Sequence, residues 1–266
     1  MSNSQPDVSA PYPAEGRAQA LLLAAGRGER MRPLTDACPK PLLTVRGKPL
    51  MQWAMEGLQR GGVTDLVINT AWLGEQIPAH FGPVWTGSGP APLRVRYSHE
   101  GADFGRALET AGGIVRALPH LADIFWVAAG DVFAPDFEFD AQDMARFAAS
   151  TDWAHLWLVP NPTHNPGGDF GLTADGRALN LPKRSPHDPD QMPRYTFSTI
   201  ALYKRTFFEA PWCDIAPGNP QGIAAPLAAM LRAAMDQGVV GATLYQGAWT
   251  DVGTPERLAQ LNQGHS

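Results

Sequence analysis

A segment near the N-terminus concentrates the residues that could handle phosphate. It reads LLAAGRGERMRPLT over residues 22–35 and is followed by PKPL over residues 39–42. Small residues and glycines at the end of an apolar run leave backbone amides exposed and permit unusual backbone angles, so a nucleotide can approach closely. We therefore expect a phosphate-binding loop, with nucleotide contacts from Leu23, Ala24, Ala25, Gly26 and Gly28.

Two cations follow the glycines. Arg30 offers a planar fork and Lys40 a point charge, and together they could offset the charge that develops on a triphosphate. Both are candidate catalytic residues, and Lys40 would also contact the nucleotide. A lone Gly-x-Gly would equally fit a strand-to-loop turn. The segment lacks the third glycine of a dinucleotide fingerprint and the Gly-Lys-Ser/Thr of a Walker loop, so it predicts neither of those sites.

The longer segment resembles the signature of the sugar-phosphate nucleotidyltransferases, also called nucleotide-sugar pyrophosphorylases. That signature reads Leu-Ala-Ala-Gly-x-Gly-x-Arg-(Leu/Met)-x-Pro-Leu-Thr, followed by Pro-Lys-Pro. The resemblance covers about residues 20–260. It implies an enzyme that joins a nucleoside triphosphate to a sugar 1-phosphate and releases pyrophosphate.

The resemblance also implies a Mg²⁺ cofactor held by two aspartates. It places the first ligand at Asp131, after an apolar run, and the second at Asp251 in the sequence WTDVGT of residues 249–254. Carboxylate and phosphate oxygens are the ligands that Mg²⁺ prefers, so two aspartates with substrate and water suffice. Either aspartate alone would fit a turn. Their joint occurrence with the N-terminal signature favours the metal role.

Between these aspartates, the sequence ALETAGG of residues 107–113 looks like the family's Leu-Gly-Thr-Ala loop, which contacts the base. The resemblance implies that Thr110 and Gly112 bind the nucleotide. Glu109 stands where a glycine is more common in the family. The glycine pair could instead allow close packing of a helix.

An alternation of strand-like and helical segments must position these residues. Strands are expected over residues 20–24, 66–69, 93–97 and 125–128, and helices over residues 49–60, 73–80 and 112–118. That order predicts an α/β fold, a Rossmann-like, doubly wound, mostly parallel sheet. The resemblance implies a nucleotidyltransferase fold of the glycosyltransferase-A-like type. Asp131 follows a fully apolar run and should lie at the carboxyl edge of the sheet, where such folds bind ligands.

The second half of the chain is less regular and is expected to shape the acceptor pocket. Strands are expected over residues 156–159, 170–173, 196–203 and 239–245, and a helix over residues 223–237. Thr254 precedes Pro255 and Glu256, which is typical of a helix N-terminus. The resemblance points to Asp169 and Gly171 as sugar contacts.

Composition limits the classes of function. The 266 residues are 44% apolar and 18% charged, which predicts one globular cytoplasmic domain over residues 17–266 after a flexible leader over residues 1–16. A net charge of −5 argues against non-specific nucleic-acid binding. No apolar run is long enough to span a bilayer. The two cysteines, Cys38 and Cys213, lack metal-ligand spacing.

Within the family, local details look most like the N-acetylmuramate 1-phosphate uridylyltransferases, which implies UTP as donor and a role in cell-wall (peptidoglycan) recycling. The lactyl carboxylate of that acceptor would need a cation, and Lys183, Arg184 and Arg194 are candidates. Mannose 1-phosphate guanylyltransferases, which use GTP and make GDP-mannose, are the alternative, and choline-phosphate cytidylyltransferases come third. A non-catalytic regulatory or binding protein is disfavoured, because it has no chemical need for two cations and two carboxylates together.

Overall fold

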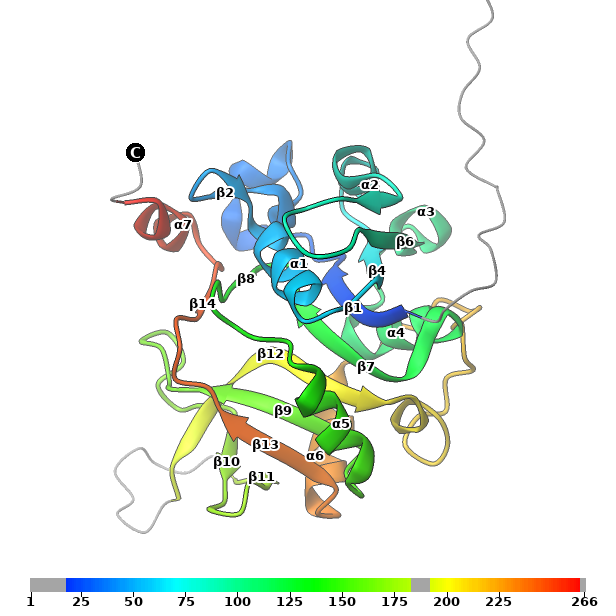
Figure 1. The fold of residues 1–266 in the computed structure, drawn as a ribbon, viewed down its shortest axis with the longest axis vertical. Coiled ribbons are helices and arrows are strands. Elements are labelled where there is room, and N and C mark those ends of the chain that lie inside the picture. Colours follow the sequence, from blue (N-terminus) through cyan, green and yellow to red (C-terminus); the bar gives the residue numbers. More distant parts are fainter. Residues whose placement is uncertain (1–17, 183–191, 264–266) are drawn as a thin grey trace, which may run out of the picture.

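The computed structural model describes residues 18–182 and 192–263. The expected leader and the candidate cations Lys183 and Arg184 lie outside these residues. Figure 1 shows a sheet that runs through the molecule, with β1, β4 and β6 in its upper part and β9, β10, β11 and β13 in its lower part. Within the described residues, no helix is long and apolar enough to cross a membrane.

The centre of the sheet is parallel. Strand β1 (Ala18–Ala24) lies between β7 (Leu121–Ala129) and β4 (Asp65–Thr70), and β4 pairs in parallel with β6 (Leu93–His99). All four strands were predicted from their apolar runs. The prediction of an α/β fold with a mostly parallel central sheet is confirmed, and the carboxyl ends of β1, β4 and β7 meet at one edge.

The sheet becomes antiparallel at its ends. Strand β12 (Arg194–Lys204) runs antiparallel to β7 and to β9 (Ala154–Val159), and β9 pairs in parallel with β13 (Val240–Leu244). Short strands complete the sheet: β10 (Phe170–Leu172) and β11 (Ala178–Leu179) beside β12, and β5 (Val84–Trp85) beside β6. Two small pairs lie outside the sheet, β2 (Thr44–Val45) with β3 (Lys48–Pro49) and β8 (Val132–Phe133) with β14 (Thr250–Asp251).

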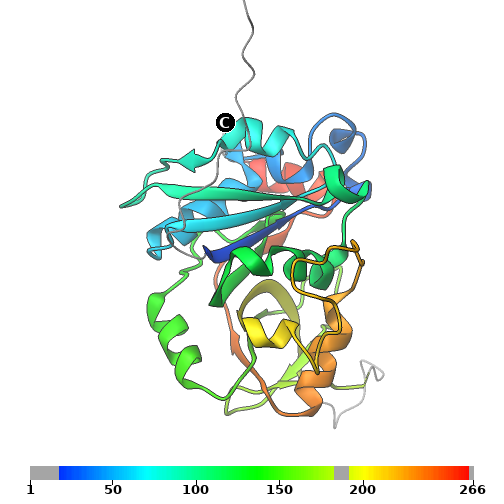
Figure 2. The same ribbon diagram turned by 90° about the vertical axis from the view of Figure 1, so that its right-hand side faces the viewer.

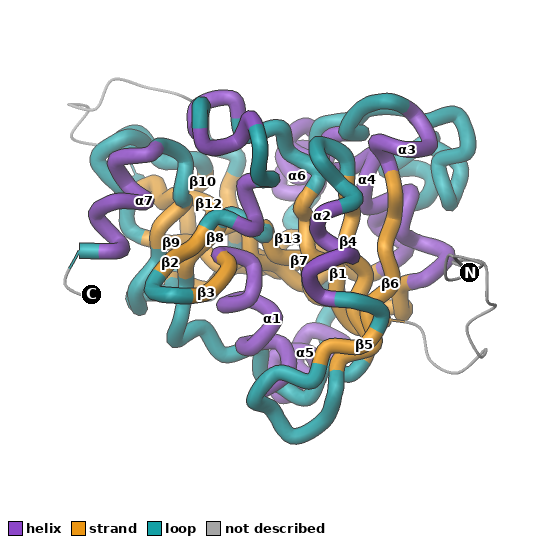
Figure 3. The backbone as a smooth tube through the Cα atoms, turned by 90° about the horizontal axis from the view of Figure 1, so that it is seen from above, coloured by secondary structure: helices purple, strands orange, loops and turns teal. Residues whose placement is uncertain are grey.

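Helices cover both faces of the sheet, as a doubly wound fold requires (Figures 2 and 3). Alternation along β1 shows the two faces, since Leu21 packs into one buried cluster while Ala20 and Leu22 pack into another. The first cluster contains residues of α4 (Glu109–Ala117) and α6 (Leu227–Asp236), and the second contains residues of α1 (Leu50–Arg60) and α5 (Ala141–Ala149). The remaining helices are α2 (Gln76–Phe81), α3 (Glu100–Phe104) and α7 (Pro255–Asn262).

Three helix starts show where local chemistry decides a boundary. Helix α2 begins three residues later than predicted, because Leu73 has a φ of 47° and cannot continue a right-handed helix. Helix α6 begins after Pro226 rather than at residue 223, since Pro226 has an extended backbone (ψ 141°). Helix α7 begins as predicted, and the Thr254 side chain accepts a hydrogen bond from the backbone N–H of Arg257 (3.4 Å).

Candidate active site

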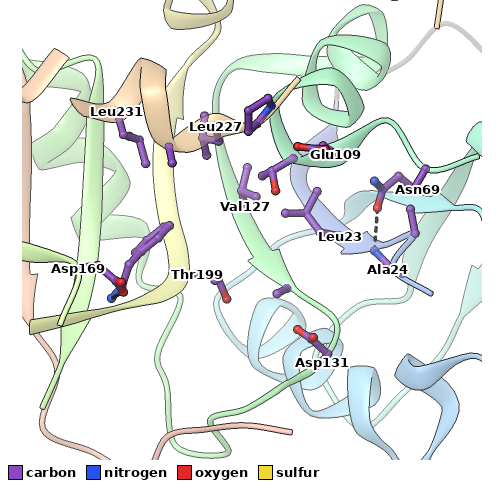
Figure 4. Close-up of a pocket in the computed structure, with 18 of the residues that line it drawn as sticks. Leu23, Ala24, Asn69, Glu109, Val127, Asp131, Asp169, Thr199, Leu227 and Leu231 are labelled. Carbon is purple, nitrogen blue, oxygen red and sulfur yellow. Dashed lines mark hydrogen bonds between the residues drawn. The ribbon is translucent and has the colours of Figure 1, made fainter. Parts of the chain in front are cut away.

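A cavity of about 640 Å³ opens at the carboxyl ends of β1 and β7. That volume is in the usual range for small-molecule sites. Its two ends come from different parts of the sheet, the parallel half and the antiparallel half. Figure 4 shows Ala24, Asn69 and Glu109 at one end, Asp169 and Leu231 at the other, and Thr199 and Asp131 between them.

The predicted phosphate loop forms part of the cavity wall. Ala25 and Gly26 line the cavity, and their backbone N–H groups donate to no acceptor among the described residues. A Cβ added at Gly26 would have no atom within 4 Å, so the space beside this backbone is open. Gly28 adopts a φ of 66° and lies against Thr35 and Lys40, which explains why glycine is needed there. The loop can therefore receive phosphate oxygens.

Two residues that the sequence reasoning missed hold this loop in place. The guanidinium of Arg27 stacks 3.6 Å from the ring centroid of Trp72 and donates to the carbonyl of Thr35 (2.9 Å). The indole N–H of Trp72 donates to the same carbonyl (2.9 Å). The hydroxyl of Thr35 in turn donates to the carbonyl of Gly28 (2.9 Å). An arginine and a tryptophan so far apart in sequence give no local signal of this contact.

Lys40 and Asp131 meet in the cavity. Both residues line it, and the Lys40 ammonium forms an ion pair with Oδ2 of Asp131. The Lys40 side chain is only 10% exposed, whereas the Asp131 carboxylate is 37% exposed. Arg30 differs from both, since it is exposed and does not line the cavity. The catalytic role of Arg30 stays a prediction, while the structure brings Lys40 and Asp131 to the phosphate loop.

Backbone pairing between β14 and β8 brings Asp251 next to Asp131. Strand β14 pairs Asp251 with Val132, and the N–H of Val252 donates to the carbonyl of Asp131 (3.0 Å). The Asp251 side chain does not line the cavity. Its Oδ1 contacts Nη1 of Arg257 (2.6 Å) and Nε2 of His164 (2.8 Å), and neither contact was expected from the sequence.

The donor set fits a hard cation only if the substrates contribute. Asp131 presents a partly exposed carboxylate next to the open phosphate loop. In Asp251, Oδ1 is buried beside Arg257 and His164 and has no hydrogen-bond partner among the described residues, so Oδ2 is its candidate ligand. Within the described ranges, no three His, Cys, Asp or Glu side chains gather as a complete metal site. Phosphate and water oxygens would therefore have to complete the coordination of Mg²⁺.

The segment expected to contact the base lies at the opposite end of the cavity from Asp169. Thr110 lines the cavity, as does Glu109 at the start of α4. Glu109 has a φ of 57°, a left-handed conformation that favours glycine, which fits the glycine that the resemblance led us to expect there. Gly112 is buried and does not line the cavity. A Cβ there would lie 2.4 Å from the carbonyl of Ile223, so this glycine serves close packing, the second of the two predicted roles.

A buried pair of polar residues, which was not predicted from the sequence, joins the phosphate loop to the segment of residues 107–113 that is expected to contact the base. Asn69 accepts a hydrogen bond from the backbone N–H of Ala24 (2.7 Å) through Oδ1 and donates to Oε1 of Glu100 (2.7 Å). The other oxygen of Glu100 accepts from the N–H of Leu108 (2.7 Å). Glu100 is fully buried, and Gly113 leaves room for the pair, since a Cβ there would lie 2.6 Å from Glu100. Asn69 and Glu100 are positioning residues.

Exchange of Glu100 for glutamine should weaken this bridge. The amide nitrogen would face one of the two N–H donors, so a buried donor would lose its acceptor at a cost of about 1–3 kcal/mol in the free energy of unfolding. Urea unfolding of wild type and Glu100→Gln measures this loss. The KM for the nucleotide should rise as well, because the two loops would no longer be fixed to each other. Equal stability and equal KM in both proteins would contradict the positioning role.

The same pair predicts a pH dependence. Burial raises the pKa of Glu100 above its ordinary value of 4.5, although the N–H of Leu108 and the amide of Asn69 oppose the shift. A raised pKa means that the folded chain holds the proton more tightly, so this contribution to stability is full below pH 4.5 and declines as the pH rises through the folded pKa. Glutamine does not titrate. The stability of the wild type relative to Glu100→Gln should therefore fall as the pH rises above 4.5, as urea unfolding at a series of pH values would measure.

The end of the cavity around Asp169, which was expected to receive the acceptor and is here called the acceptor end, combines one predicted sugar contact with several unpredicted residues. Asp169 lines the cavity, and its Oδ2 accepts from the backbone N–H of Phe197 (2.9 Å). Gly171 lies outside the lining, where a Cβ would meet the side chain of Leu181 at 2.5 Å, so packing explains this glycine. The unpredicted lining residues at this end come from β10, β12 and α6; they are Phe170, Phe197, Thr199, Tyr203, Leu231 and Arg232.

Comparison with known proteins agrees with this geometry. A family model described as nucleotidyl transferase matches residues 19–265. The chain is 43% identical over 244 residues to N-acetylmuramate alpha-1-phosphate uridylyltransferase of Neisseria meningitidis serogroup B, with 91% of this chain and 96% of that protein covered. The enzyme of that name from Caulobacter vibrioides is 31% identical over 248 residues, with 81% and 96% covered. The solved structure of HddC from Yersinia pseudotuberculosis shares the fold, with a TM-score of 0.67 over 94% of this chain and 100% of that one at 18% identity.

Proposed function

The chain belongs to the nucleotidyl transferase family, and from this premise we propose that it transfers a uridylyl group from UTP to N-acetylmuramate 1-phosphate, with release of pyrophosphate. The observation that carries the choice of substrates is the 43% identity to the Neisseria meningitidis uridylyltransferase, which extends over nearly the full length of both proteins. The cavity supports the reaction class, because an open phosphate loop, a lysine and an aspartate meet in it.

The proposed reaction needs no protein nucleophile. An oxygen of the sugar phosphate attacks the α-phosphorus of UTP in line, and pyrophosphate leaves along the glycine-rich loop. The backbone N–H groups of Ala25 and Gly26 receive phosphate oxygens, and the ammonium of Lys40 offsets the charge that grows on them. Thr110 contacts the uracil end. Arg30, exposed beside the loop, is proposed as a second cation for the triphosphate.

Asp131 and Asp251 are the proposed ligands of Mg²⁺. When bound, the ion would neutralise phosphate charge and align the two substrates. Asp131 offers its carboxylate directly to the cavity. Oδ1 of Asp251 is buried beside Arg257 and His164, so Oδ2 is the oxygen proposed for the metal. Asp169 is proposed to accept a hydrogen bond from a sugar hydroxyl, since it lines the end of the cavity away from Thr110.

Pyrophosphate release in the presence of Mg²⁺ tests this proposal in a two-by-two design that pairs UTP or GTP with N-acetylmuramate 1-phosphate or mannose 1-phosphate. We expect turnover with UTP and N-acetylmuramate 1-phosphate. Turnover only with GTP and mannose 1-phosphate would refute the proposed substrates and keep the reaction class. The enzymatic function itself would be overturned if the chain released no pyrophosphate with any of these four pairs and none with CTP and choline phosphate.

A further inference from the structure

Among the described residues that line the cavity, only Lys40 and Arg232 carry a positive charge. Lys40 is already paired with Asp131 at the phosphate edge. Arg232 lies on α6, directly after Leu231, which Figure 4 shows at the acceptor end of the cavity together with Asp169. The described part of the cavity therefore places one cation near the phosphate loop and a separate one at the acceptor end.

The guanidinium of Arg232 is held by neutral groups. Its Nη1 donates to Oδ1 of Asn180 (2.7 Å), and its Cζ lies 5.1 Å from the ring centroid of Phe170, which also lines the cavity. Asn180 is itself fixed by Asp236, since its amide nitrogen donates to both carboxylate oxygens (3.1 Å each). In the described part of the chain, Arg232 makes no ion pair. Its charge and most of its five N–H donors stay available in a half-buried position.

Two carboxylates lie near this end, Asp236, which binds Asn180, and Asp169, which lines the cavity; among the described residues, neither forms an ion pair with Arg232. Asp169 accepts from the backbone N–H of Phe197 (2.9 Å) and from the amide of Asn165 (3.3 Å). Arg194, which the sequence offered as a candidate cation, is also committed. It donates to the backbone carbonyls of Gly167 (2.9 Å), Leu181 (2.6 Å) and Asp169 (2.7 Å), so it builds the wall and does not line the cavity.

We propose that Arg232 binds the carboxylate of the acceptor and so selects an acidic sugar 1-phosphate over neutral ones. This inference rests on the proposed function, because N-acetylmuramate differs from N-acetylglucosamine by a lactyl ether that ends in a carboxylate. An arginine fork held in a half-buried pocket matches a carboxylate by two parallel hydrogen bonds. A neutral acceptor would leave that fork without its partner, which penalises the wrong substrate.

The exchange Arg232→Met tests this inference, since methionine keeps much of the aliphatic stem against Phe170 and removes the charge. The assay is pyrophosphate release at saturating UTP, with N-acetylmuramate 1-phosphate and N-acetylglucosamine 1-phosphate as separate acceptors. We expect kcat/KM for the acidic acceptor to fall on the order of 10- to 100-fold, mainly through KM, as for the loss of a charged hydrogen bond. The value for the neutral acceptor should change little. Arg146→Met is the matched control, because Arg146 is exposed on α5, pairs with Asp143 and does not line the cavity.

The outcomes separate the two proposals. A wild-type chain that does not turn over N-acetylmuramate 1-phosphate would overturn the proposed function and this inference together. If the wild type uses this acceptor but Arg232→Met lowers kcat/KM equally for both acceptors, the inference alone would be overturned. Arg232 would then bind the phosphate that both acceptors share. An unchanged variant would overturn it as well. Selective loss of the acidic acceptor, with Arg146→Met unaffected, would support it.

Discussion

Exchange of Asp131 for asparagine should reduce pyrophosphate release by about 10³-fold or more while the chain stays folded. Asparagine keeps the shape of the side chain but removes the negative charge that a Mg²⁺ ligand must supply in the cavity. The fold should persist because the amide oxygen of asparagine can still accept a hydrogen bond from the ammonium of Lys40, whose side chain is only 10% exposed. Steady-state kinetics and thermal unfolding of the purified variant measure the two effects.

Asp103→Asn is the matched control for this loss. Asp103 also forms an ion pair, with Arg116, and its side chain is 42% exposed, but it lies outside the cavity. Its variant should keep wild-type turnover. If Asp131→Asn also kept near-normal turnover, the proposed metal role of Asp131 would be refuted. If it unfolded instead, Asp131→Glu would distinguish a missing charge from a missing fold, because glutamate keeps the carboxylate.

Features that are local in sequence could be predicted without the structure. The phosphate loop directly follows β1, so a correct prediction of this one strand was enough to place the loop residues at the site. Asp131 needed one more step, that β7 and β1 are parallel neighbours whose carboxyl ends share an edge. The strands of the parallel half could also be predicted, because each one is marked by an apolar run in its own local sequence. Helix α5 was missed, although Asp140 caps it by accepting from the N–H of Gln142 (2.8 Å).

Features that depend on packing between distant segments could not be predicted. The bridge from Ala24 through Asn69 to Glu100 joins residues 45 and 31 positions apart, and nothing in the sequence near Glu100 indicates a fully buried carboxyl. Gly112 shows the opposite case, since a glycine in a motif suggested a ligand contact, while the close approach of the carbonyl of Ile223 also requires a glycine there. Its nucleotide contact stays a prediction. Arg232 lies in an ordinary amphipathic helix, and only the tertiary fold places it in the cavity.

Lys40→Met should lower kcat on the order of 10²-fold and change the affinity for the acceptor little. Methionine fills most of the volume of the nearly buried Lys40 stem, which packs beside Gly28, but it removes the ammonium next to Asp131. The charge that develops on the phosphates would then lose a cation that acts more strongly in the transition state than in the ground state. Rapid-quench measurement of a single turnover would show whether the chemical step is the one that slows.

Lys48→Met separates this effect from the general cost of losing a lysine ion pair. Lys48 pairs with Glu56 (2.6 Å) and lies 3.9 Å from the ring centroid of Trp53, but it does not line the cavity. Both variants lose one cation that contacts a carboxylate, so equal losses of turnover would mean that stability, not phosphate chemistry, is affected. A normal kcat in Lys40→Met would refute the catalytic role of Lys40. A lowered kcat in Lys40→Met together with a normal kcat in Lys48→Met would show that the Lys40 ammonium accelerates the reaction.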